Sequence, residues 1–124
     1  MFFYLVITGL LFLIVGFRAL LQPVEAVAIP YSFSANNVDT KNYLRSGAGG
    51  VAIAAGAVMI AGAFIPALTL SAAMISVTIL GGLVFGRVVS LMLDGNPGIV
   101  PWISGFFELL GLVSGAYWLQ FYLS

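Results

Sequence analysis

The chain has 124 residues, contains no cysteine and no histidine, and only 6% of its residues are charged. These absences exclude disulfides, thiolate nucleophiles, imidazole bases and the usual ligands of zinc, haem and copper. Since no catalytic motif is present either, we expect no catalytic residues and no metal site. The formal net charge is zero, so the chain has no basic surface of the kind that attracts nucleic acid, and we expect no nucleic-acid partner.

Apolar side chains, in contrast, make up 62% of the residues, and the charged fraction falls far below the roughly 25% of ordinary soluble domains. A chain this short buries only part of its surface when it folds, so it could not hide this many apolar side chains from water. A lipid bilayer as solvent removes the conflict. We therefore predict a single transmembrane domain over residues 1–124, with the lipid bilayer as its first partner.

The apolar residues fall into four runs, each near the ~20 residues that a helix needs to span ~30 Å of hydrocarbon. We predict transmembrane helices over about 2–21, 40–63, 66–93 and 100–123. Pro66 suits a first helical turn, and the run Asp-Gly-Asn-Pro-Gly at 94–98 is typical of a turn. The long loop 22–39 contains Tyr31 and Phe33, which suit the membrane interface.

Lipid permits only helices or closed barrels, because every backbone polar group must be satisfied internally. Four strands cannot close a barrel, and the runs lack strict alternation of apolar and polar residues. The predicted fold class is therefore all-α, a four-transmembrane-helix bundle with up-down-up-down topology.

In this topology the basic residues gather at the end of the bundle that holds the two longer loops. They are Arg18, Lys41, Arg45 and Arg87. The positive-inside rule places that end in the cytoplasm and both termini outside. We also expect an aromatic belt, with Tyr4, Tyr117, Trp118 and Tyr122 near the terminal face and Tyr43 and Trp102 near the loop face.

Small residues mark the faces where helices are expected to pack. Residues 46–50 read Ser-Gly-Ala-Gly-Gly, and the third and fourth helices contain Gly82-x-x-x-Gly86 and Gly111-x-x-x-Gly115. Such spacing lets helix backbones approach closely in lipid. Packing inside the bundle is the simpler interpretation. A homo-oligomer, or docking onto a membrane-protein partner through these Gly-rich faces, is the alternative.

Two ionisable residues lie within the apolar runs. Glu108 is about eight residues into the last helix, or roughly 12 Å deep, and Arg87 lies roughly 9 Å from the end of the third. A charge at such depth should face protein or a wet cavity. Because Cβ bonds tilt toward the N-terminus of a helix, side chains on these antiparallel neighbours lean toward each other. We predict a bidentate Arg87–Glu108 ion pair.

A wider polar cluster is expected around this pair, because Arg18 and Arg45 approach the same end of the bundle. The local excess would be about two positive charges before the carboxylates of the loops are counted, and such an excess could bind an anion. The candidate site, either ligand-binding or structural, comprises Arg18, Arg45, Arg87, Asp94, Glu108, Ser90 and Ser104. In the structural interpretation the arginines reach lipid phosphates and the ion pair fixes helix register.

The order of these residues resembles a known family. The segments are Tyr43-Leu44-Arg45 leading to Gly49-Gly50, then Gly86-Arg87-Val88-Val89-Ser90-Leu91 with Asp94-Gly95-Asn96-Pro97, then Glu108-Leu109-Leu110-Gly111. They resemble a family of small bacterial membrane proteins catalogued as a domain of unknown function and broadly similar to DoxX-like four-helix proteins. The resemblance covers most of the chain. It implies a bacterial inner membrane and importance for Arg45, Arg87, Asp94 and Glu108. DoxX-like relatives are associated with quinone-linked oxidation, although this chain carries no redox ligand of its own.

We therefore predict a small polytopic membrane protein without catalytic machinery or a cofactor of its own, acting as a structural or accessory partner of a membrane assembly. The first alternative is a quinone- or lipid-binding protein whose cavity is closed by the loop 22–39, with an anion site at the loop-side mouth. The second is a small transporter that uses Glu108, for which a single carboxylate is a poor proton relay.

Overall fold

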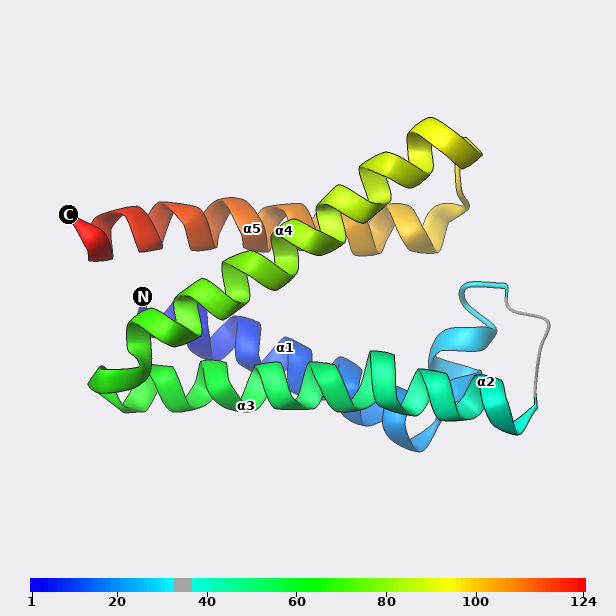
Figure 1. The fold of residues 1–124 in the computed structure, drawn as a ribbon, viewed down its shortest axis with the longest axis horizontal. Helices are drawn as coiled ribbons and strands as arrows, with labels where there is room; N and C mark the ends of the chain where they lie inside the picture. The colour runs from blue at the N-terminus through cyan, green and yellow to red at the C-terminus, as the bar shows by residue number, and fades with distance from the viewer. Residues whose placement is uncertain (33–36) are drawn as a thin grey trace.

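The computed structural model describes residues 1–32 and 37–124 and shows four long helices (Figure 1). Phe33, expected at the membrane interface, lies outside this range. The described part contains no strand. The first helix is α1 (Phe2–Leu21), which a short π-helical segment, η1 (Val24–Ala28), follows. The second long helix consists of α2 (Val38–Tyr43), η2 (Leu44–Gly50) and α3 (Val51–Phe64). The third consists of η3 (Pro66–Leu68) and α4 (Thr69–Asp94). The fourth is α5 (Ile99–Leu123).

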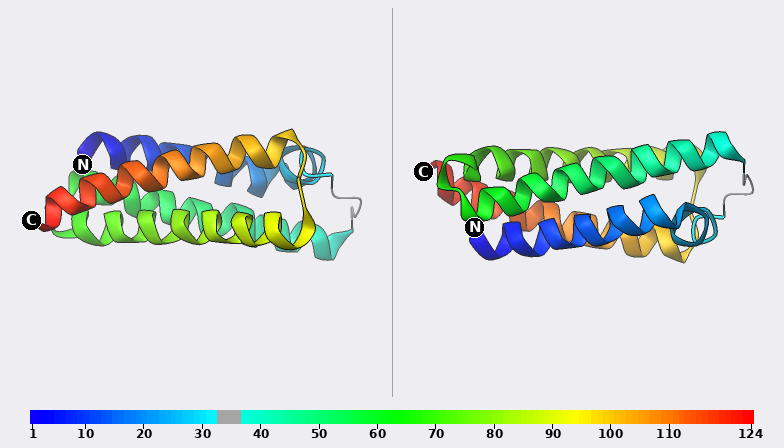
Figure 2. Two further views of the ribbon diagram at one scale, coloured as in Figure 1. Left: turned by 90° about the horizontal axis from the view of Figure 1, so that it is seen from above. Right: turned by 90° about the horizontal axis from the view of Figure 1, so that it is seen from below.

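All four helices are long and apolar enough to cross a membrane, and their ends differ from the expected ones by at most two residues. Both termini lie at one end of the molecule, and the longer connections lie at the other (Figure 2). The predicted fold class, an all-α bundle of four membrane-spanning helices running up, down, up and down, is confirmed.

Local chemistry fixes where the helices begin and end. The Asn37 side chain accepts a hydrogen bond of 2.8 Å from the backbone N–H of Thr40 and so caps the second helix. Ile65 is extended and Pro66 begins the next turn, because proline suits a first helical turn. Gly95 has φ +94°, a conformation that favours glycine, and it ends α4.

The first two helices pack backbone to backbone. A Cβ added at Gly56 would lie 2.8 Å from the carbonyl oxygen of Gly9, and one added at Gly16 would lie 2.9 Å from the carbonyl oxygen of Gly49. No side chain fits between the helices at these points. The glycines at 49 and 56 therefore serve packing inside the bundle, as the simpler interpretation of the small-residue faces expected.

Tyr4 is a buried residue of the core and does not belong to the aromatic belt. Its side chain is 8% exposed. The phenol donates to the backbone oxygen of Gly111 (3.1 Å) and shares a 2.7 Å hydrogen bond with the hydroxyl of Ser76, which then acts as the donor. Gly115 has no side chain to obstruct the phenol. Assigning Tyr4 to the interface was wrong because its hydroxyl finds partners on both α4 and α5.

The bundle is tight near the termini and open near the loops. Figure 1 shows α4 leaving α3 and crossing α5 towards the loop side. The buried residues of α4 all lie in its first half, at Ala72, Ala73, Ser76 and Leu80, and α5 buries only Gly115. The later half of α4 and the earlier half of α5 therefore face each other with little else packed against them.

Candidate functional site

A pocket of about 700 Å³ opens between α4 and α5 at the loop-side end. Residues from segments 82–91 and 97–109, together with Tyr31, form its walls, and we call it the α4–α5 groove. Most of these residues are apolar. Gly82 and Gly86 lie in the wall, and a Cβ added at either would meet no atom within 4 Å. This small-residue motif therefore leaves the groove wide and packs against no other helix in the described part of the chain.

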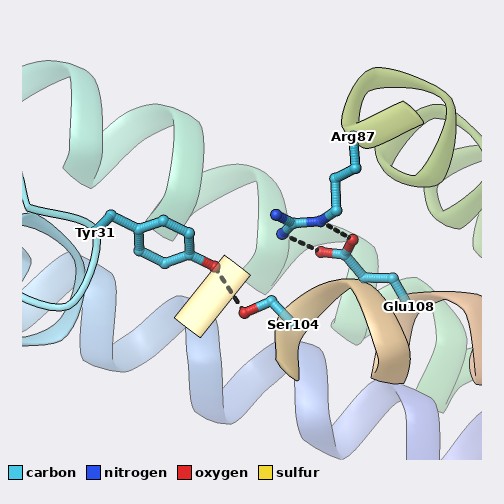
Figure 3. Close-up of polar contacts among 4 residues, drawn as sticks. All are labelled: Tyr31, Arg87, Ser104 and Glu108. Carbon is cyan, nitrogen blue, oxygen red and sulfur yellow. Dashed lines mark hydrogen bonds and ion pairs between the residues drawn. The ribbon is translucent and has the colours of Figure 1, made fainter. Parts of the chain in front are cut away.

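Arg87, which lines this groove, forms an ion pair with Glu108. The Arg87 guanidinium donates through Nε to Oε2 and through Nη2 to Oε1, the latter at 2.8 Å (Figure 3). The two side chains are 29% and 16% exposed. A Cβ at Gly105 would lie 3.1 Å from Cδ of Arg87, so the glycine leaves room for the arginine stem. The bidentate geometry expected from the opposed tilts of the two helices is present.

Part of the guanidinium remains available. Arginine has five N–H donors, and the ion pair uses two of them, so three remain: both on Nη1 and one on Nη2. Across residues 1–32 and 37–124, no buried side-chain nitrogen or oxygen lacks a partner. Nη1, which has no hydrogen-bond partner, is therefore accessible on Arg87, a residue that lines the groove.

A second polar contact lies beside the pair. The phenol of Tyr31 and the hydroxyl of Ser104 share a hydrogen bond of 2.7 Å. Tyr31 follows η1 and points from the first connection towards α5 and the guanidinium (Figure 3). The sequence indicated an interfacial position for Tyr31 and placed Ser104 in the cluster, but no pattern in the sequence pointed to this contact. It closes one side of the groove.

Ser90 and Asp94 lie further along α4, at the mouth of the groove. The Ser90 hydroxyl donates to the Asp94 carboxylate at 3.1 Å, one helical turn away. Across the mouth, the indole N–H of Trp102 donates to the side-chain oxygen of Asn96 at 2.7 Å. Ser90 and Trp102 line the groove, whereas Asp94 is exposed and does not.

Arg18 and Arg45 are not brought to the ion pair. Both side chains are exposed and neither lines the groove. Arg45 donates through Nη1 to the backbone oxygen of Leu20 at the end of α1. Because α1 and η2 pack against each other, the Arg45 guanidinium stays at that seam and does not line the groove.

The described residues hold no group of three or more His, Cys, Asp or Glu side chains that could bind a metal ion. The polar side chains of Arg87, Tyr31 and Ser90 line the groove next to its apolar wall and can form hydrogen bonds there, and Ser104 is bonded to Tyr31. No curated protein and no solved structure matches the chain. A family model does match, over residues 1–119, and its description is a domain of unknown function, DUF4345. The chain, with its four membrane-spanning helices and the α4–α5 groove, belongs to this family.

Proposed function

We propose that this small multi-pass membrane protein binds an amphiphile of the quinone or lipid class in the α4–α5 groove. The observation that carries the proposal is a guanidinium at an apolar pocket with N–H donors that Glu108 does not use. The volume of about 700 Å³ is within the usual range for small-molecule sites, about 300–1,000 Å³. Apolar walls beside a few polar groups match a molecule with an acyl or isoprenoid tail and a polar head.

The membrane setting makes the unused donors significant. Water is scarce in hydrocarbon, so an N–H without an acceptor costs several kcal/mol. Arg87 lies seven residues from the end of α4 at Asp94, or about 10 Å along the helix. An acceptor carried by an amphiphile satisfies these donors without requiring water at that depth. We also propose that the chain is related to DoxX-like proteins, whose association with quinone-linked oxidation agrees with a quinone as the amphiphile.

The transporter alternative receives less support from the same geometry. Both carboxylate oxygens of Glu108 accept hydrogen bonds from Arg87. A proton carrier at this position would have to release Arg87 in every cycle.

A role as accessory partner of a membrane assembly is the second candidate, and the exposure of α5 favours it. Only 6% of the apolar window of α5 is buried, against 33% for α1. Its exposed side chains include contacting aromatic rings, Tyr117 with Trp118 and Tyr117 with Phe121. Such a face suits either acyl chains or another membrane helix.

For the membrane and orientation we propose the bacterial inner membrane with the loop-side end in the cytoplasm. Arg18, Lys41, Arg45 and Arg87 support this orientation, since all lie in the halves of their helices nearer that end. Labelling single cysteines introduced at Asn42 and at Ser124 with a membrane-impermeant maleimide tests it. Labelling in intact cells at Ser124 and not at Asn42 is expected, and the reverse pattern would invert the orientation.

Native mass spectrometry after mild detergent extraction tests the main proposal. A stoichiometric adduct of an amphiphile is expected on the wild-type chain. Gly86→Leu fills the groove, because open space surrounds that position, and should remove the adduct. Gly50→Leu is the matched control: Gly50 is an exposed helical glycine away from the groove, and a Cβ there would lie 3.8 Å from the backbone oxygen of Arg45.

Three results decide between the candidates. An adduct on the wild type and on Gly50→Leu that is lost from Gly86→Leu supports amphiphile binding. An adduct that Gly86→Leu retains would move the ligand out of the groove. A co-purifying protein with no small-molecule adduct would favour the accessory role.

A further inference from the structure

The charge of the α4–α5 groove decides which head groups it accepts. Arg87 is the only Lys or Arg among its lining residues in the described chain, and Glu108 neutralises it through two hydrogen bonds. Arg18 and Arg45 do not line the groove. The polar end of the groove therefore has no excess positive charge, in contrast to the excess of about two that the sequence indicated.

An anionic head is disfavoured by this balance. A phosphate or carboxylate at Arg87 would compete with Glu108 for one guanidinium, and like charges at short range repel strongly where the effective dielectric constant is low. The Asp94 carboxylate at the mouth, to which Ser90 donates, adds a second negative charge at the loop-side end. Releasing Glu108 from the pair would leave its own charge unpaired.

A cationic head group is also disfavoured. Both oxygens of Glu108 already accept hydrogen bonds from Arg87. An ammonium group close to Glu108 would stand beside the positive guanidinium, and no carboxylate lines the groove within the described residues.

We infer that the groove selects amphiphiles whose head group is an uncharged hydrogen-bond acceptor, above all a carbonyl, over anionic and cationic ones. The inference rests on the proposed function and names the ligand class for the same site. Its physical basis is that the groups left over at the pair are donors: three N–H groups of Arg87 remain after the two that bind Glu108. A neutral carbonyl accepts from them without disturbing the ion pair.

Two sources carry such a carbonyl, a quinone ring and the acyl esters of an uncharged glyceride. Both present carbonyl oxygens next to a long apolar tail, which is the combination that the apolar walls and the donors of Arg87 match.

Tryptophan quenching tests the selection directly. The chain has two tryptophans; Trp102 lines the groove, and Trp118 lies elsewhere on α5. In a Trp118→Phe background, Trp102 is the single reporter. The full chain in nanodiscs is titrated with probes that share brominated acyl chains and differ in the head: diacylglycerol (neutral), phosphatidylglycerol (anionic) and diacyl-trimethylammonium-propane (cationic).

Saturable quenching by diacylglycerol is expected at a concentration at least tenfold lower than for either charged probe. Gly86→Leu, with its filled groove, should leave only the linear quenching that arises from partition into the bilayer. A further arm uses decylbenzoquinone, which quenches tryptophan itself. Half-saturation at lower quinone than diacylglycerol assigns the head to the quinone class, and the reverse order assigns it to glycerides.

The outcomes separate the two proposals. Preference for the anionic or the cationic probe, or equal quenching by all three, would overturn the selection of a neutral head and leave groove binding intact. Quenching that does not saturate, or that is unchanged in Gly86→Leu, would remove groove binding and the selection with it. A shift of preference towards the anionic probe in Glu108→Gln supports the charge balance as its cause.

Discussion

Replacing Glu108 with glutamine removes the charge that neutralises Arg87 while nearly preserving the shape of the side chain. One amide oxygen still accepts from the guanidinium, but the second hydrogen bond and the ionic attraction are lost. Removing one partner of a buried pair costs roughly 3–5 kcal/mol. Because 29% of Arg87 and 16% of Glu108 are exposed, the pair is not fully buried within the protein, and we expect the lower end, about 3 kcal/mol of unfolding free energy.

The measurement is unfolding in mixed micelles, with the helical circular dichroism signal followed as sodium dodecyl sulfate is added. The informative comparison is the double variant Arg87→Met with Glu108→Leu, which replaces both charges by apolar side chains of similar size. Such replacements are often neutral or stabilising in buried sites. The double variant should therefore be more stable than Glu108→Gln alone, even though it carries more changes.

Two results would refute this reasoning about the pair. If Glu108→Gln unfolds at the same detergent fraction as the wild type, the pair contributes nothing to stability. If the double variant is as unstable as the single one, the cost arises from lost packing, and the unpaired charge of Arg87 is not its source.

The other predictions concern packing. Tyr4→Phe leaves the fully buried hydroxyl of Ser76 without its partner and should lower the unfolding free energy by about 1–3 kcal/mol in the same assay. Tyr122→Phe, at an exposed position, should have no measurable effect. Equal effects of the two variants would show that the buried hydrogen bonds of Tyr4 do not stabilise the bundle. Gly56→Leu should disrupt the contact between α1 and α3, since its Cβ would meet backbone at 2.8 Å. In Gly86→Leu the new Cβ meets no atom within 4 Å, so this variant should leave the unfolding midpoint unchanged or raise it, because leucine is the better helix former by up to about 1 kcal/mol. A loss of stability there comparable to that of Gly56→Leu would contradict an open groove.

The helices were predictable from sequence because the thickness of the hydrocarbon sets their length and the turn residues set their ends. The ion pair was predictable because the tilt of Cβ bonds brings Arg87 and Glu108 together on antiparallel neighbours. Both inferences use properties of one helix, or of two helices in sequence.

The remaining features depend on how helices that are distant in sequence cross, which periodicity does not encode. The burial of Tyr4 depends on α1 meeting both α4 and α5 at the terminal end. The contact of Tyr31 with Ser104 joins residues 73 positions apart. The placement of Arg45 at the seam with α1, and not at the ion pair, follows from the close approach of Gly16 to Gly49.

The divergence of α4 from the rest of the bundle has a consequence for how the site would fill. Because the open stretch runs along two helices embedded in hydrocarbon, an occupant arrives sideways, by diffusion in the plane of the bilayer, without first dissolving in the aqueous phase. Occupancy then depends on the mole fraction of that molecule in the leaflet nearer the loops. Enriching the amphiphile only in the opposite leaflet would leave the α4–α5 groove empty.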